Sequence, residues 1–161
     1  MIGPFRPRFR AHRDGSTDFR IADEERSLIE TLLDQYRELL MSTAAEGSVH
    51  ETLRRLYPTA HPNDAEADAA YHELVRDELL ERRLEKLEVI EATLQHQVLS
   101  ASEALAWVTV LNDIRLVLGT SLDVSEDDDF DSLDLDDPNN QPYAVYRYLS
   151  ALQEEFVRVL S

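Results

Sequence analysis

Apolar residues recur three and four positions apart along most of the chain. This spacing is typical of amphipathic helices, because residues three and four apart lie on one helix face. Capping-box spacings that begin at Ser48 and Asn63 place the starts of two helices. The expected helices cover residues 23–41, 49–56, 64–99, 101–118 and 142–160. We therefore predict a mainly α fold, a single helical bundle of about five helices with a short N-terminal β-hairpin, and one domain over residues 1–161.

The helix expected at the centre of this bundle is the most apolar one. Ser100 and Glu103 have the spacing of a capping box, in which both side chains bond to N–H groups at the helix start. Gly119 is expected to end the helix, since glycine readily adopts the left-handed conformation. Apolar residues cover most of the circumference, which indicates burial on several sides. The predicted core residues of this helix include Trp107 and Leu111.

An alternating pattern of apolar and polar residues predicts a β-hairpin over residues 5–21. Asp14 and Gly15 stand between the two runs, and this dipeptide favours a tight hairpin turn. The alternation places phenylalanines on one face and arginines on the other. A basic face of this kind could contact a nucleic acid or an acidic partner. We favour a third interpretation, in which the arginines lie over the acidic surface of the protein itself.

Polar residues interrupt the apolar central helix at a few positions. Thr109, Asn112 and Asp113 share one stripe, and Arg115 lies beside it. A buried carboxylate or amide needs hydrogen-bond partners, so the stripe could hold a ligand or a catalytic carboxylate. It could equally bond to a neighbouring helix, which is the interpretation we favour because structural ion pairs imitate functional sites. The candidate ligand-binding residues are Asn112, Asp113 and Arg115.

Residues 120–141 form a predicted acidic loop before the last helix. Nine of the 15 residues in 123–137 are Asp or Glu. Acids alternate there as the first ligands of a calcium loop do, but the glycine at the sixth position and the glutamate at the twelfth are missing. We therefore interpret the loop as an interaction surface, the usual role of a carboxylate run. The candidate interaction residues are Asp127, Asp128, Asp129, Phe130 and Asp131.

The net charge limits the classes of partner. The chain carries 33 acidic and 16 basic residues, a formal net charge of −17. Such a charge opposes binding to nucleic acids, which needs cations to replace phosphate counterions. It equally opposes anionic membrane surfaces, and no apolar run is long enough to span a membrane. The chain has no cysteine, which suits a reducing cytoplasm.

Known chemical motifs are missing from the sequence. The four glycines are not clustered, so no glycine-rich loop can bind a phosphate. No serine stands in a nucleophile-elbow motif. The five histidines do not share the spacing of a zinc or di-iron site. We therefore assign no catalytic residue, no metal site and no cofactor, and we lean against an enzyme.

Four stretches of the chain resemble one family: RRLYP (54–58), ELVRDELLERRLEKL (73–87), WVTVLNDIRLVLGTSLDV (107–124) and YAVYRYLSALQEEFV (143–157). The family is an uncharacterised actinobacterial domain of unknown function, commonly encoded beside the Clp protease adaptor and a JAB/MPN-type metallopeptidase. Some relatives carry a transcription-regulator label. The resemblance covers nearly the whole chain and implies a bacterial, cytoplasmic setting with a link to regulated proteolysis. No functional residue carries over, because the family has no established activity.

Three functions follow as expectations. The first is a non-enzymatic, cytoplasmic regulatory or adaptor-like domain that binds a protein partner, with a component of the Clp system as one candidate. The second is a small-ligand-binding protein or an enzyme that uses the polar site on the central helix. The third is a transcription-linked regulator, which only the label on relatives implies. A homodimer is also compatible with the apolar stripe on the longest predicted helix.

Overall fold

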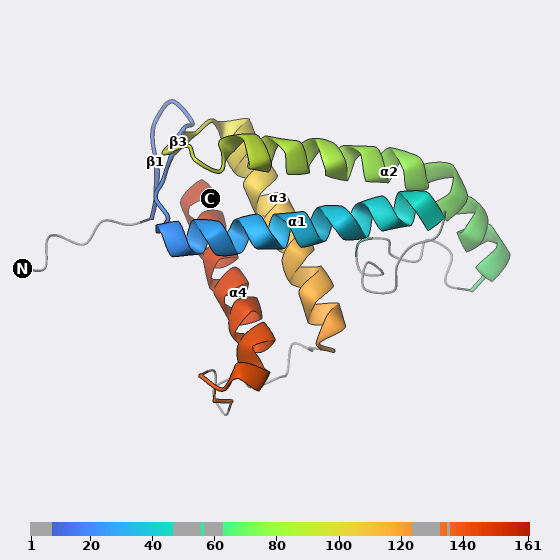
Figure 1. Cartoon of the computed structure of the whole chain (residues 1–161). Coiled ribbons are helices and arrows are strands. Elements are labelled where there is room, and N and C mark those ends of the chain that lie inside the picture. The colour runs from blue at the N-terminus through green and yellow to red at the C-terminus, as the bar shows by residue number, and fades with distance from the viewer. Residues whose placement is uncertain (1–7, 47–55, 57–62, 124–132, 135) are drawn as a thin grey trace, which may run out of the picture.

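The computed structural model describes residues 8–46, 56, 63–123, 133–134 and 136–161. Within these residues the chain is mainly helical and carries a small antiparallel sheet near its N-terminus (Figure 1). The predicted fold class, a helical bundle with an N-terminal hairpin, is therefore confirmed. The expected helix over 49–56 lies outside the described residues except for Leu56, and so do the acidic residues 127–131.

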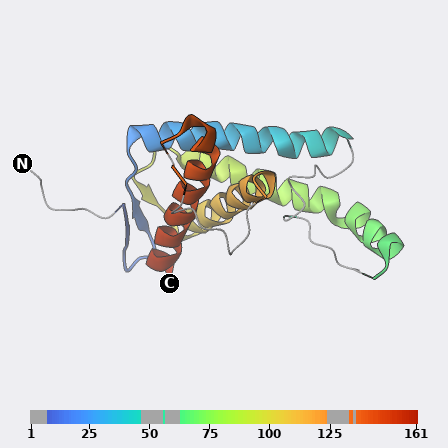
Figure 2. The ribbon, with the colours of Figure 1, turned by 90° about the horizontal axis from the view of Figure 1, so that it is seen from below.

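Long helices supply most of the described structure. They are α1 (Asp23–Glu46), α2 (Ala65–Thr93), α3 (Ala101–Ser121) and α4 (Gln141–Leu160), with a short 3₁₀ helix η2 (Pro138–Asn140) before α4. The strands are β1 (Phe9–Ala11), β2 (Thr17–Phe19) and β3 (Val98–Leu99). Figures 1 and 2 show the strands together at one end of the bundle.

Helix α3 is the centre of the packing, as its apolar circumference predicts. It contacts α1, α2 and α4, so it is covered from three sides. Trp107 is fully buried and Leu111 is 1% exposed, which confirms both predicted core positions. The Trp107 indole Nε1–H donates to the Thr93 hydroxyl oxygen of α2 at 2.8 Å. This hydrogen bond gives the one polar atom of the buried indole a partner.

Aromatic rings join the sheet to the helices. Phe9 of β1 and Phe19 of β2 stand opposite each other in the antiparallel register. The Phe9 ring stacks on Phe156 of α4 with ring centroids 4.0 Å apart, and the Phe19 ring lies 4.6 Å from the ring of Trp107. A two-stranded hairpin is marginal by itself, and these contacts give its apolar face something to pack on.

The hairpin turn and the outer face agree with the sequence. Gly15 has φ +91°, a left-handed value that favours glycine in the turn. Arg10 and Arg20 are exposed, whereas Arg8 forms an ion pair with Glu25 at the start of α1. At least this arginine therefore lies over an acidic side chain of the protein itself.

The end of α2 differs from the prediction. The helix was expected to run through residue 99, but it ends at Thr93, and β3 follows. Residues of β3 pair with β2, in the register Thr17 to Leu99 and Asp18 to Val98. The backbone groups of this segment thus bond to a strand that is distant in sequence, which helical periodicity cannot reveal.

The predicted helix caps are right at one position and wrong at two. The capping box of Ser100 and Glu103 is present at the start of α3. Gly119 does not end α3, because the helix continues to Ser121 and the left-handed residue is Asp123, with φ 54°. The N-cap of α2 is Asp64 and not Asn63, since the Asp64 carboxylate accepts the Ala67 N–H at 3.0 Å. Asn63 and Asp64 are neighbours of about equal N-cap preference, so the sequence alone does not separate them.

Two further boundaries are corrected. Helix α1 was expected to end near residue 41 but extends to Glu46. The loop expected over residues 120–141 is shorter among the described residues, because α3 and η2 occupy its two ends. Pro138 and Pro142 lie in the first turns of η2 and α4, where the missing proline N–H costs no helical hydrogen bond.

Candidate functional site

Asp113, the central residue of the predicted polar stripe, lies at the meeting point of three helices. It is 7% exposed. Its Oδ2 atom accepts the Tyr36 hydroxyl of α1 at 3.0 Å and the Arg83 guanidinium of α2 at 2.8 Å. Arg83 also donates to the backbone carbonyl of Leu56 at 2.7 Å. Asp113 therefore ties α1, α2 and α3 together, and Arg83 extends the link to the segment before α2.

Burial shifts the pKa values of the two acidic side chains in this cluster, Asp113 and Tyr36. Burial raises the pKa of Asp113, and the Arg83 charge and the Tyr36 hydrogen bond oppose that rise only in part. Burial and the neighbouring carboxylate raise the pKa of Tyr36, so the phenol keeps its proton and remains a donor. The hydrogen bonds that Asp113 accepts from Tyr36 and Arg83 come from side chains of the protein itself, as in a structural ion pair.

The other stripe residues do not join Asp113. The Arg115 guanidinium donates to the Asn112 side-chain oxygen at 2.9 Å, one helical turn away. The Thr109 hydroxyl bonds to the carbonyl oxygen of Leu105 on its own helix. The predicted set Asn112, Asp113 and Arg115 is thus divided into two separate pairings in the structure. The Arg115 Nε atom is buried and has no acceptor among the described residues.

Sequence reasoning missed the two true neighbours of Asp113. Arg83 is 30 residues away and Tyr36 is 77 residues away along the chain. Tyr36 is part of the apolar stripe of the first predicted helix, and its hydroxyl is the one polar tip in that stripe. This tip is the signal that could have suggested a buried hydrogen-bond partner.

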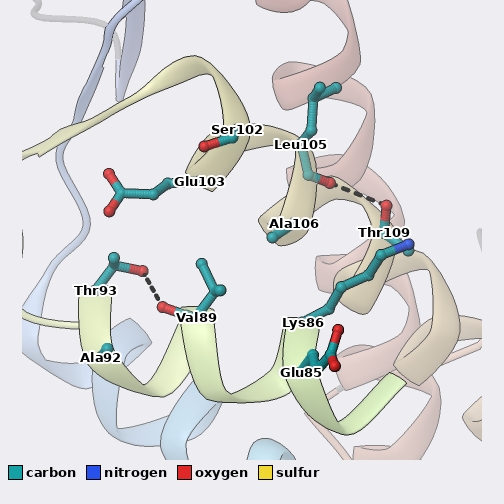
Figure 3. A pocket seen from close by; sticks show the side chains of 10 residues that line it. All are labelled: Glu85, Lys86, Val89, Ala92, Thr93, Ser102, Glu103, Leu105, Ala106 and Thr109. Atoms are coloured by element: carbon teal, nitrogen blue, oxygen red, sulfur yellow. Dashed lines mark hydrogen bonds between the residues drawn. The ribbon is translucent and has the colours of Figure 1, made fainter. Parts of the chain in front are cut away.

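An open groove lies between α2 and α3 on the surface of the bundle (Figure 3). We call it the α2–α3 groove; its volume is about 730 Å³. Its apolar side chains are Val89, Ala92, Leu105 and Ala106. Leu105 is 60% exposed, the highest value among the large hydrophobic side chains that the structure describes. Together with Val89, Ala92 and Ala106, it makes the lining of the groove more apolar than polar.

Charged and hydroxyl side chains border the same groove. Glu85 and Lys86 lie on the α2 side, and Glu103 and Thr109 lie on the α3 side (Figure 3). A second hollow, of about 450 Å³, lies along α2 and shares Glu85 with the groove. We call this second hollow the acidic trough. Its lining residues are Asp77, Leu80, Glu81, Leu84, Glu85 and Glu88.

A third hollow lies between α1 and α3. It has a volume of 270 Å³ and is lined mainly by apolar side chains, with the ring of Tyr36 among them. This volume is slightly below the range of about 300–1,000 Å³ for small-molecule sites. Asp113 lines none of these three hollows.

The described residues contain neither a cluster of metal-ligating side chains nor a membrane-spanning helix. In the residues that the structure describes, no group of three or more His, Cys, Asp and Glu side chains could hold a metal ion. No described helix combines the length and the apolar character needed to cross a lipid bilayer.

Comparison with known proteins identifies one family. A family model described as a domain of unknown function, DUF2017, matches residues 5–160. The match covers nearly the whole sequence, so the chain belongs to this family. No curated protein and no solved structure matches the chain.

Proposed function

We propose, from the premise that the chain is a DUF2017 protein, that it is a non-enzymatic regulatory or adaptor-like domain that binds another protein. The observation that carries this proposal is a contrast between interior and surface. Asp113 takes its hydrogen bonds from side chains inside the protein, whereas the α2–α3 groove presents Leu105 to solvent. Exposed apolar patches bordered by polar residues are typical of surfaces that bind proteins.

The alternative, a ligand or catalytic site on the central helix, has less support. A catalytic carboxylate must reach its substrate, but Asp113 is buried and lines none of the three hollows. Asn112 and Arg115 bond to each other and do not converge with Asp113 on a common space. We therefore assign the Asp113 group a role in holding the helices together.

A transcription-linked role is the third candidate and rests only on a label carried by relatives. The net charge of −17 opposes contact with DNA phosphates. Among the described residues, the exposed arginines of the hairpin are a basic feature that could support it. Binding of DNA in a gel shift that survives about 200 mM salt would revive this candidate.

The resemblance noted in the sequence names the first partner to test. The resemblance implies a gene neighbourhood with the Clp protease adaptor and a JAB/MPN-type metallopeptidase, so we propose a component of the Clp system as the first candidate. A bacterial, cytoplasmic setting belongs to the same proposal. A homodimer is a less favourable assembly, because two copies with a charge of −17 repel each other.

The test is affinity co-purification of the tagged protein from its own cells, at low and at high salt, with mass spectrometry of the retained proteins. The proposal expects one protein to be retained specifically and to bind again when both proteins are purified. If no protein is retained at either salt concentration, the protein-binding function is wrong. Ligand screens on the wild-type chain would then be the next measurement.

A further inference from the structure

We infer that the α2–α3 groove binds an amphipathic helix of a partner protein, whose apolar face is flanked by lysines or arginines. This inference rests on the proposed protein-binding function and names the chemistry of the partner. It is carried by three features of the described surface: its apolar lining, its length and its charge.

The apolar lining suits a helix. Val89 and Ala92 of α2 and Leu105 and Ala106 of α3 line the groove, so apolar side chains come from both of its walls. A docked helix buries residues spaced three and four apart in a groove of this kind. Alanines on both walls allow a partner backbone to approach closely, while Leu105 supplies the large apolar contact.

The length follows from the shared residue Glu85. This residue lines both the α2–α3 groove and the acidic trough, so the two hollows adjoin at Glu85 on α2. The α2 residues that line the two hollows run from Asp77 to Thr93. At 1.5 Å per residue this stretch is about 24 Å long, which accommodates about four turns of a partner helix.

The charge of the surface selects a basic partner. Five acidic residues line the two hollows, and Lys86 is the one basic residue among them. Among the described residues, no basic side chain forms an ion pair with Glu81, Glu85 or Glu88. These three carboxylates are exposed on α2. Lysines or arginines beside the apolar face of the partner would meet them, and such complementarity raises both association rate and specificity.

The same charge argues against two other occupants. A second copy of this chain would bring a net charge of −17 to an acidic surface. A partner helix with glutamates beside its apolar face would meet the same repulsion. A basic amphipathic helix from a different protein is therefore the occupant that this surface favours.

The test uses the full-length protein and synthetic peptides of about 18 residues. The probe peptide carries leucine and alanine on one helical face with lysine and arginine beside them. A shuffled peptide has the same composition but no apolar face, and a third peptide has glutamate in place of the basic residues. Fluorescence anisotropy measures the Kd of each peptide, and circular dichroism measures the helicity of the bound probe.

We expect the probe to bind as a helix and the shuffled and acidic peptides to bind at least about tenfold more weakly. The Leu105→Asn substitution should raise the Kd of the probe peptide by about tenfold, because it removes the main apolar contact. The matched control Met41→Asn, at a side chain 48% exposed on α1, should change the Kd by less than about twofold. Glu85→Gln with Glu88→Gln should weaken binding at low salt, and added salt should reduce that effect.

Several results would overturn the inference. Equal affinity for the probe and the shuffled peptide would show attraction by charge alone, and unchanged binding by Leu105→Asn would place the contact elsewhere. Absence of probe binding at millimolar concentration would rule out the occupant. Self-association in light scattering that Leu105→Asn abolishes would identify a second copy instead. If the Leu105→Asn variant still retains the cellular partner in co-purification, this inference is overturned, whereas the proposed protein-binding function stands.

Discussion

The Tyr36 hydroxyl of α1 donates a hydrogen bond of 3.0 Å to the Asp113 carboxylate of α3. The same carboxylate oxygen accepts the Arg83 guanidinium of α2, so one buried atom joins three helices. Each of these groups is costly to bury alone and acceptable to bury together. The cluster therefore fixes how the helices meet and is sensitive to the loss of any one member.

Removal of the phenolic hydroxyl tests the hydrogen bond between Tyr36 and Asp113. Tyr36→Phe keeps the buried ring but takes one donor from the Asp113 carboxylate. We expect a loss of about 1.5–3 kcal/mol in the free energy of unfolding, the usual range for a hydrogen bond to a charged group. Urea unfolding measures it. Tyr148→Phe, which removes a partly buried bond to Glu25, should cost less; an equal cost would contradict the special role of Asp113.

Removal of the cation tests the ion pair. Arg83→Met leaves the Asp113 carboxylate buried without its charge partner, and we expect a loss of about 3–5 kcal/mol near neutral pH. The double variant Arg83→Met/Asp113→Leu should recover much of that loss, because no buried charge remains. Urea unfolding of both variants gives the comparison. If the double variant is no more stable than Arg83→Met, the loss comes from packing rather than from an unpaired charge.

The stability of Arg83→Met should also depend on pH. The pKa of Asp113 is raised in the folded protein, whereas the unfolded chain releases this proton near the ordinary value of 3.8 for an aspartate. Between these two values the folded state binds more protons, so this residue lowers stability as pH rises. Loss of the Arg83 charge raises the pKa of Asp113 in the folded protein further. The pH range in which Asp113 lowers stability therefore extends to higher pH. We expect the deficit of the variant, measured by urea unfolding, to shrink between pH 7.5 and pH 5; a constant deficit would contradict this.

The central place of α3 can be tested with two leucines of the same helix. Leu111 is 1% exposed and Leu105 is 60% exposed. Leu111→Ala should lower the free energy of unfolding by about 2–5 kcal/mol, because it leaves a cavity in the core. Leu105→Ala should change it by less than about 0.5 kcal/mol. A loss below about 1 kcal/mol for Leu111→Ala would mean that α3 is not at the centre of the core.

Much of the fold could be predicted because its helices and its hairpin depend on residues that are close together in the sequence. The 3.6-residue periodicity located α1, α3 and α4, and the Asp14–Gly15 pair located the hairpin. Helix ends were less predictable where neighbouring residues offer similar caps, as at Asn63 and Asp64. Strand β3 could not be predicted, because only its pairing with β2, about 80 residues earlier, makes Val98 and Leu99 extended.

The candidate site could also be predicted only in part, because its local features are visible in the sequence but its contacts between helices are not. Asp113 stood out in the sequence because an acidic residue interrupts a helix that is apolar on nearly all sides. Its connection to Arg83 and Tyr36 depends on how three helices cross, and no local pattern carries that information. Arg115, which stood beside it in the sequence, bonds to Asn112 instead. The α2–α3 groove was not predicted either, since a hollow depends on the packing of two helices and not on one.

The most direct measurement compares two variants in the same co-purification from cells. Tyr36→Phe alters the buried cluster and leaves the surface unchanged, whereas Leu105→Asn alters the surface and leaves the cluster unchanged. If the protein acts by binding a partner at the α2–α3 groove, Tyr36→Phe should retain the partner and Leu105→Asn should lose it. Loss of the partner by Tyr36→Phe, with full retention by Leu105→Asn, would contradict the account.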